Sequence, residues 1–151
     1  MPKPLEGVRV LDFGRFLAGP FFSMMLADMG AEVIRVERPG GAEDRTTGVL
    51  APNGENLSFP LFARNKKGIT LNIGRDEVSR TVLRDLVRCS DVVTMNFSPT
   101  AVEKLGLSYK QLQAIKPDII VAAISAFGFD GPYSHRVGFD PTAQLMSGAA
   151  H

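Results

Sequence analysis

Arginine and asparagine side chains stand directly after several strand-like runs of this chain, in segments that also contain glycine. They are Arg15, Arg38, Arg75 and Asn96. A guanidinium donates charge-assisted hydrogen bonds to phosphate oxygens, and backbone N–H groups in glycine-rich turns bind anions as well. The residue types and their positions therefore predict a site for an anionic ligand at the ends of several strands.

The elements that must position these residues alternate between strands and helices. Strands are predicted over residues 8–12, 32–37, 68–73, 91–95 and 118–124, and helices over 20–30, 76–88, 99–105, 108–115 and 140–150, with a helical turn over 58–64. A strand, a helix and a second strand within about 30 residues form a βαβ unit with parallel strands. The pattern predicts a Rossmann-like α/β fold with a doubly wound, mainly parallel sheet. The run over 118–124 is apolar almost throughout, so we expect it in the middle of that sheet.

The loop after the first strand is the main candidate for ligand contact, because open parallel sheets bind ligands at the carboxyl ends of their strands. Its glycines, Gly14 and Gly19, are five residues apart with bulky residues between them. This spacing departs from the G-x-G-x-x-G pattern of dinucleotide-binding proteins and disfavours an NAD site. The loop is either a tight turn that closes the helix onto the sheet or a segment that touches the ligand.

Other charged residues also allow two interpretations. Glu37 at the end of the second strand could bind an NAD ribose, and the adjacent Arg38 a phosphate, or the two could be exposed surface charges. The basic run over residues 64–67 is either a solvated face or a cationic rim for an anionic cofactor. Asp140 is expected to be the N-cap of the last helix, with Pro141 at its first position. We expect Cys89 to be buried rather than catalytic.

The composition excludes some classes of partner. The net charge of +1 among 151 residues argues against nucleic acid as the main partner. No apolar run approaches the length of a membrane span, and no signal peptide is visible, so a cytoplasmic protein is expected. The two histidines show no metal-ligand or triad spacing. The chain ends in the apolar stretch 144–151, which we interpret as a truncation, because natural domain ends are usually polar.

These segments together resemble the family III CoA-transferases, the group of formyl-CoA transferase, carnitine CoA-transferase and α-methylacyl-CoA racemase. The resemblance covers nearly the whole chain and depends on the order and spacing of several motifs. They are Ala18-Gly-Pro20, the segment 26–34, Val36-Glu-Arg-Pro39, the segment 65–71, the segment 91–97, and Gly138-Phe-Asp140 with Gln144.

The resemblance implies that acyl-CoA binds to this half of the protein as substrate, without a metal and without NAD. By position in the motifs, the implied CoA-binding residues are Arg15, Phe16, Leu17, Ala18, Arg38, Arg75, Asn96, Phe97 and Lys104. Leu17 stands where formyl-CoA transferase has glutamine, which favours a less polar acyl group. Phe139 stands where the racemases have histidine, which argues against racemase activity.

In the transferases an aspartate attacks the thioester, forms a mixed anhydride and releases CoA, which then passes to a second carboxylic acid. The resemblance implies that this aspartate lies beyond His151, so no catalytic residue is expected within residues 1–151. These residues would be the N-terminal part of an incomplete CoA-binding large domain, without the small domain and the C-terminal return. The parent would be an interlocked homodimer. Two alternatives stay open, a fragment of an NAD-type Rossmann oxidoreductase and a non-catalytic CoA- or nucleotide-binding module.

Overall fold

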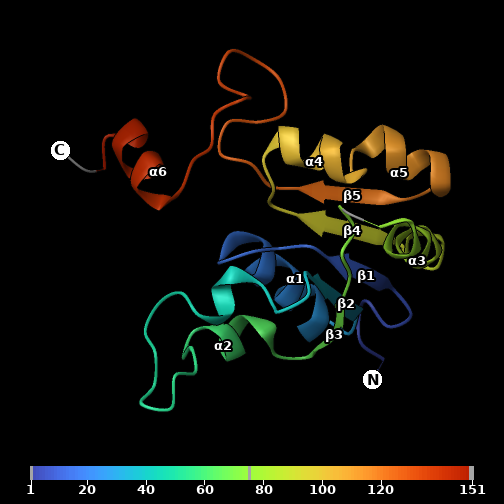
Figure 1. The fold of residues 1–151 in the computed structure, drawn as a ribbon, viewed down its shortest axis with the longest axis horizontal. Helices are drawn as coiled ribbons and strands as arrows, with labels where there is room; N and C mark the ends of the chain where they lie inside the picture. The colour runs from blue at the N-terminus through green and yellow to red at the C-terminus, as the bar shows by residue number, and fades with distance from the viewer. Residues whose placement is uncertain (1, 75, 150–151) are drawn as a thin grey trace.

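Five parallel strands form a single sheet in the order β3-β2-β1-β4-β5 (Figure 1). The computed structural model describes residues 2–74 and 76–149. The strands are β1 (Arg9–Asp12), β2 (Glu32–Glu37), β3 (Lys66–Thr70), β4 (Val92–Met95) and β5 (Ile120–Ala123). The order runs outward from β1 in both directions along the chain, which is the doubly wound arrangement that the strand and helix pattern predicted.

Helices cover both faces of the sheet. They are α1 (Ala18–Asp28), the 3₁₀ turn η1 (Glu43–Arg45), α2 (Phe59–Ala63), α3 (Glu77–Arg88), α4 (Pro99–Leu105), α5 (Tyr109–Ile115) and α6 (Asp140–Ser147). On one face, α1 packs against the sheet with α2 beside it, and on the other face α3 lies against α5. Figure 1 shows α6 apart from the sheet, at the end of a long loop.

Buried apolar side chains form two clusters, one on each face of the sheet, because successive side chains of a strand point to opposite faces. Leu11 and Phe13 point to the α3 side, where the larger cluster also contains Leu83 of α3 and Leu112 of α5. The smaller cluster lies under α1 and consists of Val10, Ala27, Ala31 and Val33. Because successive residues of a strand point to opposite faces, Asp12 and Arg35 fall on the α1 side with Val10 and Val33. A polar layer is therefore buried beneath the start of α1.

Two strand predictions were wrong in detail. The third strand was expected over 68–73, but it starts at Lys66, because Lys66 to Thr70 pair in register with Val33 to Glu37 of β2. The apolar run over 118–124 was expected at the centre of the sheet. It forms β5 at one edge, where Ile120 is 62% exposed. The apolar run predicts a strand, but it specifies neither the neighbours of that strand nor how deeply it is buried.

Three local expectations also need correction. Cys89 is exposed, at the C-cap position that follows the last turn of α3. Phe139, with an extended backbone, is the N-cap of α6, and Asp140 is the first helical residue, whose carboxylate accepts a hydrogen bond from Gln144. Helix α1 begins at Ala18, before the predicted Pro20.

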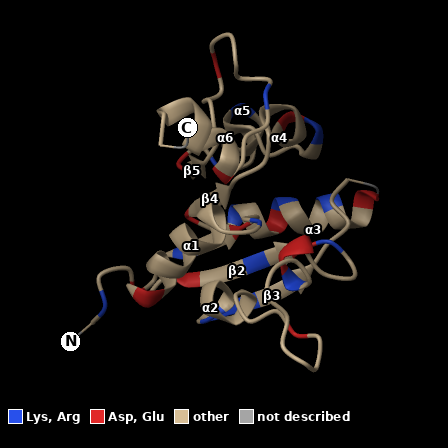
Figure 2. Ribbon diagram, turned by 90° about the vertical axis from the view of Figure 1, so that its left-hand side faces the viewer, with Lys and Arg blue, Asp and Glu red and all other residues tan. Residues whose placement is uncertain are grey.

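Charges of both signs are interleaved on the surface. Figure 2 shows basic and acidic residues alternating along α3, where Arg84 pairs with Glu77 and Arg88 with Asp85. Among the described residues, none of the helices combines the length and the apolar character that crossing a membrane requires.

Candidate functional site

The loop from Gly14 to Gly19, at the carboxyl end of β1, is held by Asn96 at the end of the neighbouring strand β4. The side-chain oxygen of Asn96 accepts a hydrogen bond from the Arg15 N–H at 2.7 Å, and its Nδ2 donates to the Arg15 carbonyl oxygen at 2.9 Å. Both ends of the amide are thereby engaged. The structure thus brings two predicted site residues together, and Asn96 acts in it as the support of the loop.

The two glycines of the loop meet at its base. A Cβ at Gly19 would lie 2.7 Å from the Cα of Gly14, and a Cβ at Gly14 would lie 2.8 Å from the Gly19 carbonyl carbon. Contacts this short leave no room for a side chain at either position. The five-residue spacing therefore closes a tight turn that seats the start of α1 against β1, as one of the two interpretations of this loop predicted.

A buried carboxylate stabilises the same turn from below. Asp12 accepts hydrogen bonds from the Gly14 N–H at 2.7 Å, from the Ser23 hydroxyl at 2.7 Å and from Lys66 Nζ at 2.9 Å. The side chains of Asp12 and Lys66 are 0% and 1% exposed. Burial lowers the pKa of the Lys66 ammonium, and the Asp12 charge opposes that shift. The basic run over 64–67 is therefore only partly exposed to solvent, since the Lys66 side chain is buried and paired with Asp12.

Arg15 is bound mainly by backbone carbonyls. Its Nη1 donates to the carbonyl oxygens of Phe13, Gly14 and Val36 at 2.9–3.2 Å. Its guanidinium also lies over the Phe97 ring, 5.3 Å from the ring centre. Burial, together with the nearby charge of Arg35, lowers the pKa of Arg15. The structure thus brings Arg15 and Phe97 into contact.

Arg38 follows β2 and stands at the surface, with its side chain 62% exposed. Its Nε donates to the Gly41 carbonyl oxygen at 3.0 Å, and its Nη2 pairs with Glu43 at 3.1 Å.

The adjacent Glu37 is buried instead. Its two oxygens accept hydrogen bonds from Arg35, from Arg45 and from the Ala42 N–H, and these lower its pKa to about 2 against the cost of burial. With its oxygens engaged in this way, Glu37 is not available to a nucleotide ribose.

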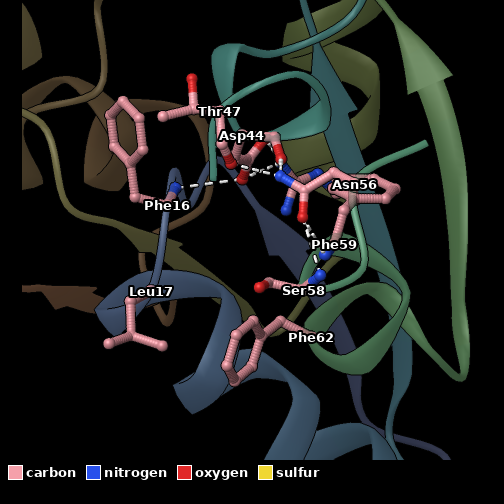
Figure 3. Close-up of a pocket in the computed structure, with 9 residues that line it drawn as sticks. Phe16, Leu17, Asp44, Thr47, Asn56, Ser58, Phe59 and Phe62 are labelled. Atoms are coloured by element: carbon pink, nitrogen blue, oxygen red, sulfur yellow. Dashed lines mark hydrogen bonds and ion pairs between the residues drawn. The ribbon is translucent and has the colours of Figure 1, made fainter. Parts of the chain in front are cut away.

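A cavity of about 240 Å³ opens beside the loop (Figure 3). Its lining residues are Phe16, Leu17, Arg35, Asp44, Thr47, Asn56, Ser58, Phe59 and Phe62. Figure 3 shows Phe16 and Leu17 on the side of the loop, opposite Phe59 and Phe62 from α2. The mouth is apolar and the floor is polar.

The floor of the cavity fixes the conformation of the loop. Asp44 binds Arg35 Nη2 with both carboxylate oxygens, at 2.7 and 2.8 Å, and accepts a hydrogen bond from the Phe16 N–H at 3.0 Å. Phe16 has φ +59°, an unfavourable backbone angle for a residue with a side chain. The hydrogen bond to Asp44 stabilises this conformation, which directs Phe16 and Leu17 along the cavity.

Several residues of this cavity were not predicted from the sequence. They are Arg35, Asp44, Asn56 and Phe59. Asn56 donates to the Asp44 carbonyl oxygen at 2.9 Å and accepts hydrogen bonds from the N–H groups of Ser58 and Phe59 at 2.7 and 3.2 Å. The one available signal was Arg35, a charged residue at a position of β2 that shares a face with the apolar Val33. A charge at a buried strand position requires a partner.

Lys104 is not part of this cluster: it is exposed in the last turn of α4 and does not line the cavity. Arg75 lies outside the described residues.

A larger cavity of about 780 Å³ lies between α4, α5, β5 and the loop that follows β5. Its lining residues are not those of the Gly14–Gly19 loop, so we place the candidate site at the smaller cavity.

Metal ligands do not cluster in the described part of the chain. Within residues 2–74 and 76–149, His, Cys, Asp and Glu side chains form no group of three or more that could hold a metal ion.

Comparisons with known proteins show the family of this chain. Residues 5–151 match the model of CoA-transferase family III. The chain is 45% identical over 150 residues to mouse succinyl-CoA:glutarate CoA-transferase, covering 99% of this chain and 34% of the relative. It is 43% identical over 148 residues to succinyl-CoA–D-citramalate CoA-transferase of Chloroflexus aurantiacus, covering 97% of this chain and 37% of the relative.

A solved structure shows the same arrangement. The crystal structure of a CaiB/BaiF family protein from Brucella suis superposes with a TM-score of 0.89 at 39% identity, over 98% of this chain and 40% of that one. The chain thus spans about a third of the length of the curated relatives that it matches. The matched residues include nearly every described element, from β1 to α6. The chain belongs to CoA-transferase family III.

Proposed function

We propose that the whole protein moves CoA from an acyl-CoA to a carboxylic acid. The family match over residues 5–151 and the CoA-transferase names of the relatives support this reaction. The observation that carries it is the loop after β1. It places Arg15, with Arg38 just after β2, at the ligand-binding edge of the sheet, beside a small cavity with an apolar mouth. Arginines suit the phosphates of CoA, and the cavity suits its acyl group.

The acyl group is proposed to be short. The cavity of about 240 Å³ is smaller than the roughly 300–1,000 Å³ of pockets for drug-sized ligands. Its mouth is lined by Leu17 and by Phe16, Phe59 and Phe62, which favours a largely apolar chain next to the thioester. Two of the relatives are named for succinyl-CoA as donor. We therefore propose an acyl chain no longer than succinyl, and the apolar mouth concerns its methylene part, since succinyl itself ends in a carboxylate.

Residues 1–151 are proposed to contribute the N-terminal part of the CoA-binding large domain. In this proposal the nucleophilic aspartate, the small domain and the C-terminal return come from other parts of the protein. The Arg15–Ala18 loop, Phe97 and the exposed cations Arg38 and Lys104 bind the coenzyme, while Asn96 holds the loop. An interlocked homodimer and a cytoplasmic location belong to the same proposal.

Calorimetry tests this proposal on the chain itself. CoA and acetyl-CoA are expected to bind more tightly than NAD. Arg38→Ala should weaken CoA binding by about 1.5–3 kcal/mol, the value of a hydrogen bond between charged groups. Arg80→Ala, which removes another largely exposed arginine, from α3, serves as the matched control and should leave CoA binding unchanged.

The opposite ranking would refute the proposal. Tighter binding of NAD than of CoA would favour a dinucleotide-binding function. Equal CoA affinities of the Arg38 and Arg80 variants would instead place Arg38 among the solvated surface charges.

A further inference from the structure

Glu43 lies between the two arginines of the proposed phosphate site. One of its carboxylate oxygens is 3.1 Å from Arg38 Nη2, and the other is 4.0 Å from Arg15 Nε. These arginines come from different segments, after β1 and after β2, and both stand at the edge of the sheet where ligands bind. A carboxylate thus occupies the position next to both guanidinium groups.

The carboxylate of Glu43 differs from the other acidic groups nearby. Asp44 and Glu37 are buried and accept several hydrogen bonds each. The Glu43 side chain is 44% exposed, and its ion pair with Arg38 is formed at the surface. Its backbone is anchored independently, because the Glu43 carbonyl oxygen accepts hydrogen bonds from the Thr46 N–H at 3.2 Å and the Thr47 hydroxyl at 2.8 Å. The side chain can therefore turn away while the backbone stays in place.

A phosphate that pairs with these guanidinium groups would lie close to the Glu43 carboxylate, and the two anions would repel each other. From this geometry we infer that Glu43 is a built-in competitor of the coenzyme phosphate. In the free protein its carboxylate pairs with Arg38 and lies 4.0 Å from Arg15 Nε. A coenzyme phosphate displaces it on binding, so Glu43 lowers coenzyme affinity. The inference rests on the proposed CoA-binding function and adds a determinant of affinity to that site.

The charge-removing variant Glu43→Gln tests the inference. Glutamine keeps the size and an acceptor oxygen but loses the competing charge. CoA should bind about two- to fivefold more tightly to this variant at low salt, the range expected for a partly exposed ion pair. The gain should shrink at high ionic strength because salt screens exposed charges. Glu55→Gln is the matched control, since it removes the same charge from the same long loop, and it should leave CoA affinity unchanged.

Three ligands and one double variant separate the possible outcomes. If Glu43→Gln raises the affinity for both CoA and dephospho-CoA, the two arginines bind the diphosphate. If it raises the affinity for CoA alone, they bind the 3′-phosphate. Pantetheine, which carries neither group, should show no gain. In the Arg38→Ala background, Glu43→Gln should have little further effect.

The inference is overturned by an unchanged or weaker CoA affinity of Glu43→Gln, by an equal gain in Glu55→Gln, or by a gain that extends to pantetheine. Each of these results is distinct from a failure of the proposed function, in which the unaltered chain would not bind CoA in an Arg38-dependent manner. Circular dichroism melting confirms that each variant is folded.

Discussion

Replacing Lys66 with methionine should strongly destabilise the chain, because it leaves the Asp12 carboxylate buried without its cation. Both side chains are almost completely buried, at 1% and 0% exposure, and Lys66 Nζ is 2.9 Å from Asp12. Removing one partner of a buried ion pair costs about 3–5 kcal/mol. A domain of this size is stable by about 5–15 kcal/mol, so the variant should lose a large part of its stability.

Urea unfolding followed by circular dichroism measures this loss of free energy. Thermal unfolding gives a second measurement: in a chain of this length each kcal/mol lost lowers the midpoint temperature by roughly 2–4 °C, so the midpoint should fall by about 6–20 °C. Lys67→Met is the matched control. Lys67 is the next residue in β3, its side chain is 71% exposed, and it pairs with Glu32 at the surface. That pair should contribute no more than about 1 kcal/mol.

The double variant Asp12→Asn/Lys66→Met tests the cause of the effect. If the unpaired charge is responsible, the double variant should be more stable than Lys66→Met alone, although it weakens the hydrogen bond to the Gly14 N–H. Equal stabilities of Lys66→Met and Lys67→Met would refute the reasoning, since the two lysines differ chiefly in burial and in their partners.

Two further predictions concern pH and catalysis. The pKa of Glu37 is lowered from 4.5 to about 2 in the folded chain, so its stabilising contribution should be present above about pH 4.5 and lost as the pH falls toward 2. Urea unfolding at a series of pH values should show this loss, and Glu37→Gln should flatten the dependence; the same slope in both proteins would contradict the assignment. Residues 1–151 alone should show no CoA transfer from succinyl-CoA to glutarate in a chromatographic assay. Turnover that disappears in Asp140→Asn would show that the nucleophile lies within this chain.

Local patterns in the sequence were sufficient for the elements and for their class. The alternation of apolar runs and helical segments predicted five strands, and the structure has five parallel strands in a doubly wound sheet. The turn after β1 was recognised from its glycines, and the contact between Gly14 and Gly19 explains their spacing. The motifs also carried the resemblance to the family, which the match over residues 5–151 confirmed.

The same patterns were insufficient where a residue depends on distant partners. Lys66 was considered as part of a basic surface run, yet its side chain crosses beneath α1 to Asp12, which lies 54 residues away in the chain. The run that forms β5 was expected at the centre of the sheet because it is apolar. Its place at the edge depends on pairing with β4 alone.

The sequence by itself thus determined the strand and helix order, the turn after β1 and the membership of a family. Each of these follows from residues close together in the chain, through backbone preferences and the periodicity of apolar side chains. Only the tertiary structure decided that Asp44 binds Arg35 and the Phe16 N–H, that Asn96 holds Arg15, and that Glu43 stands between two arginines. Hydrogen bonds and ion pairs act over a few ångströms, so they depend on how the strands are ordered and on where each loop returns to the sheet.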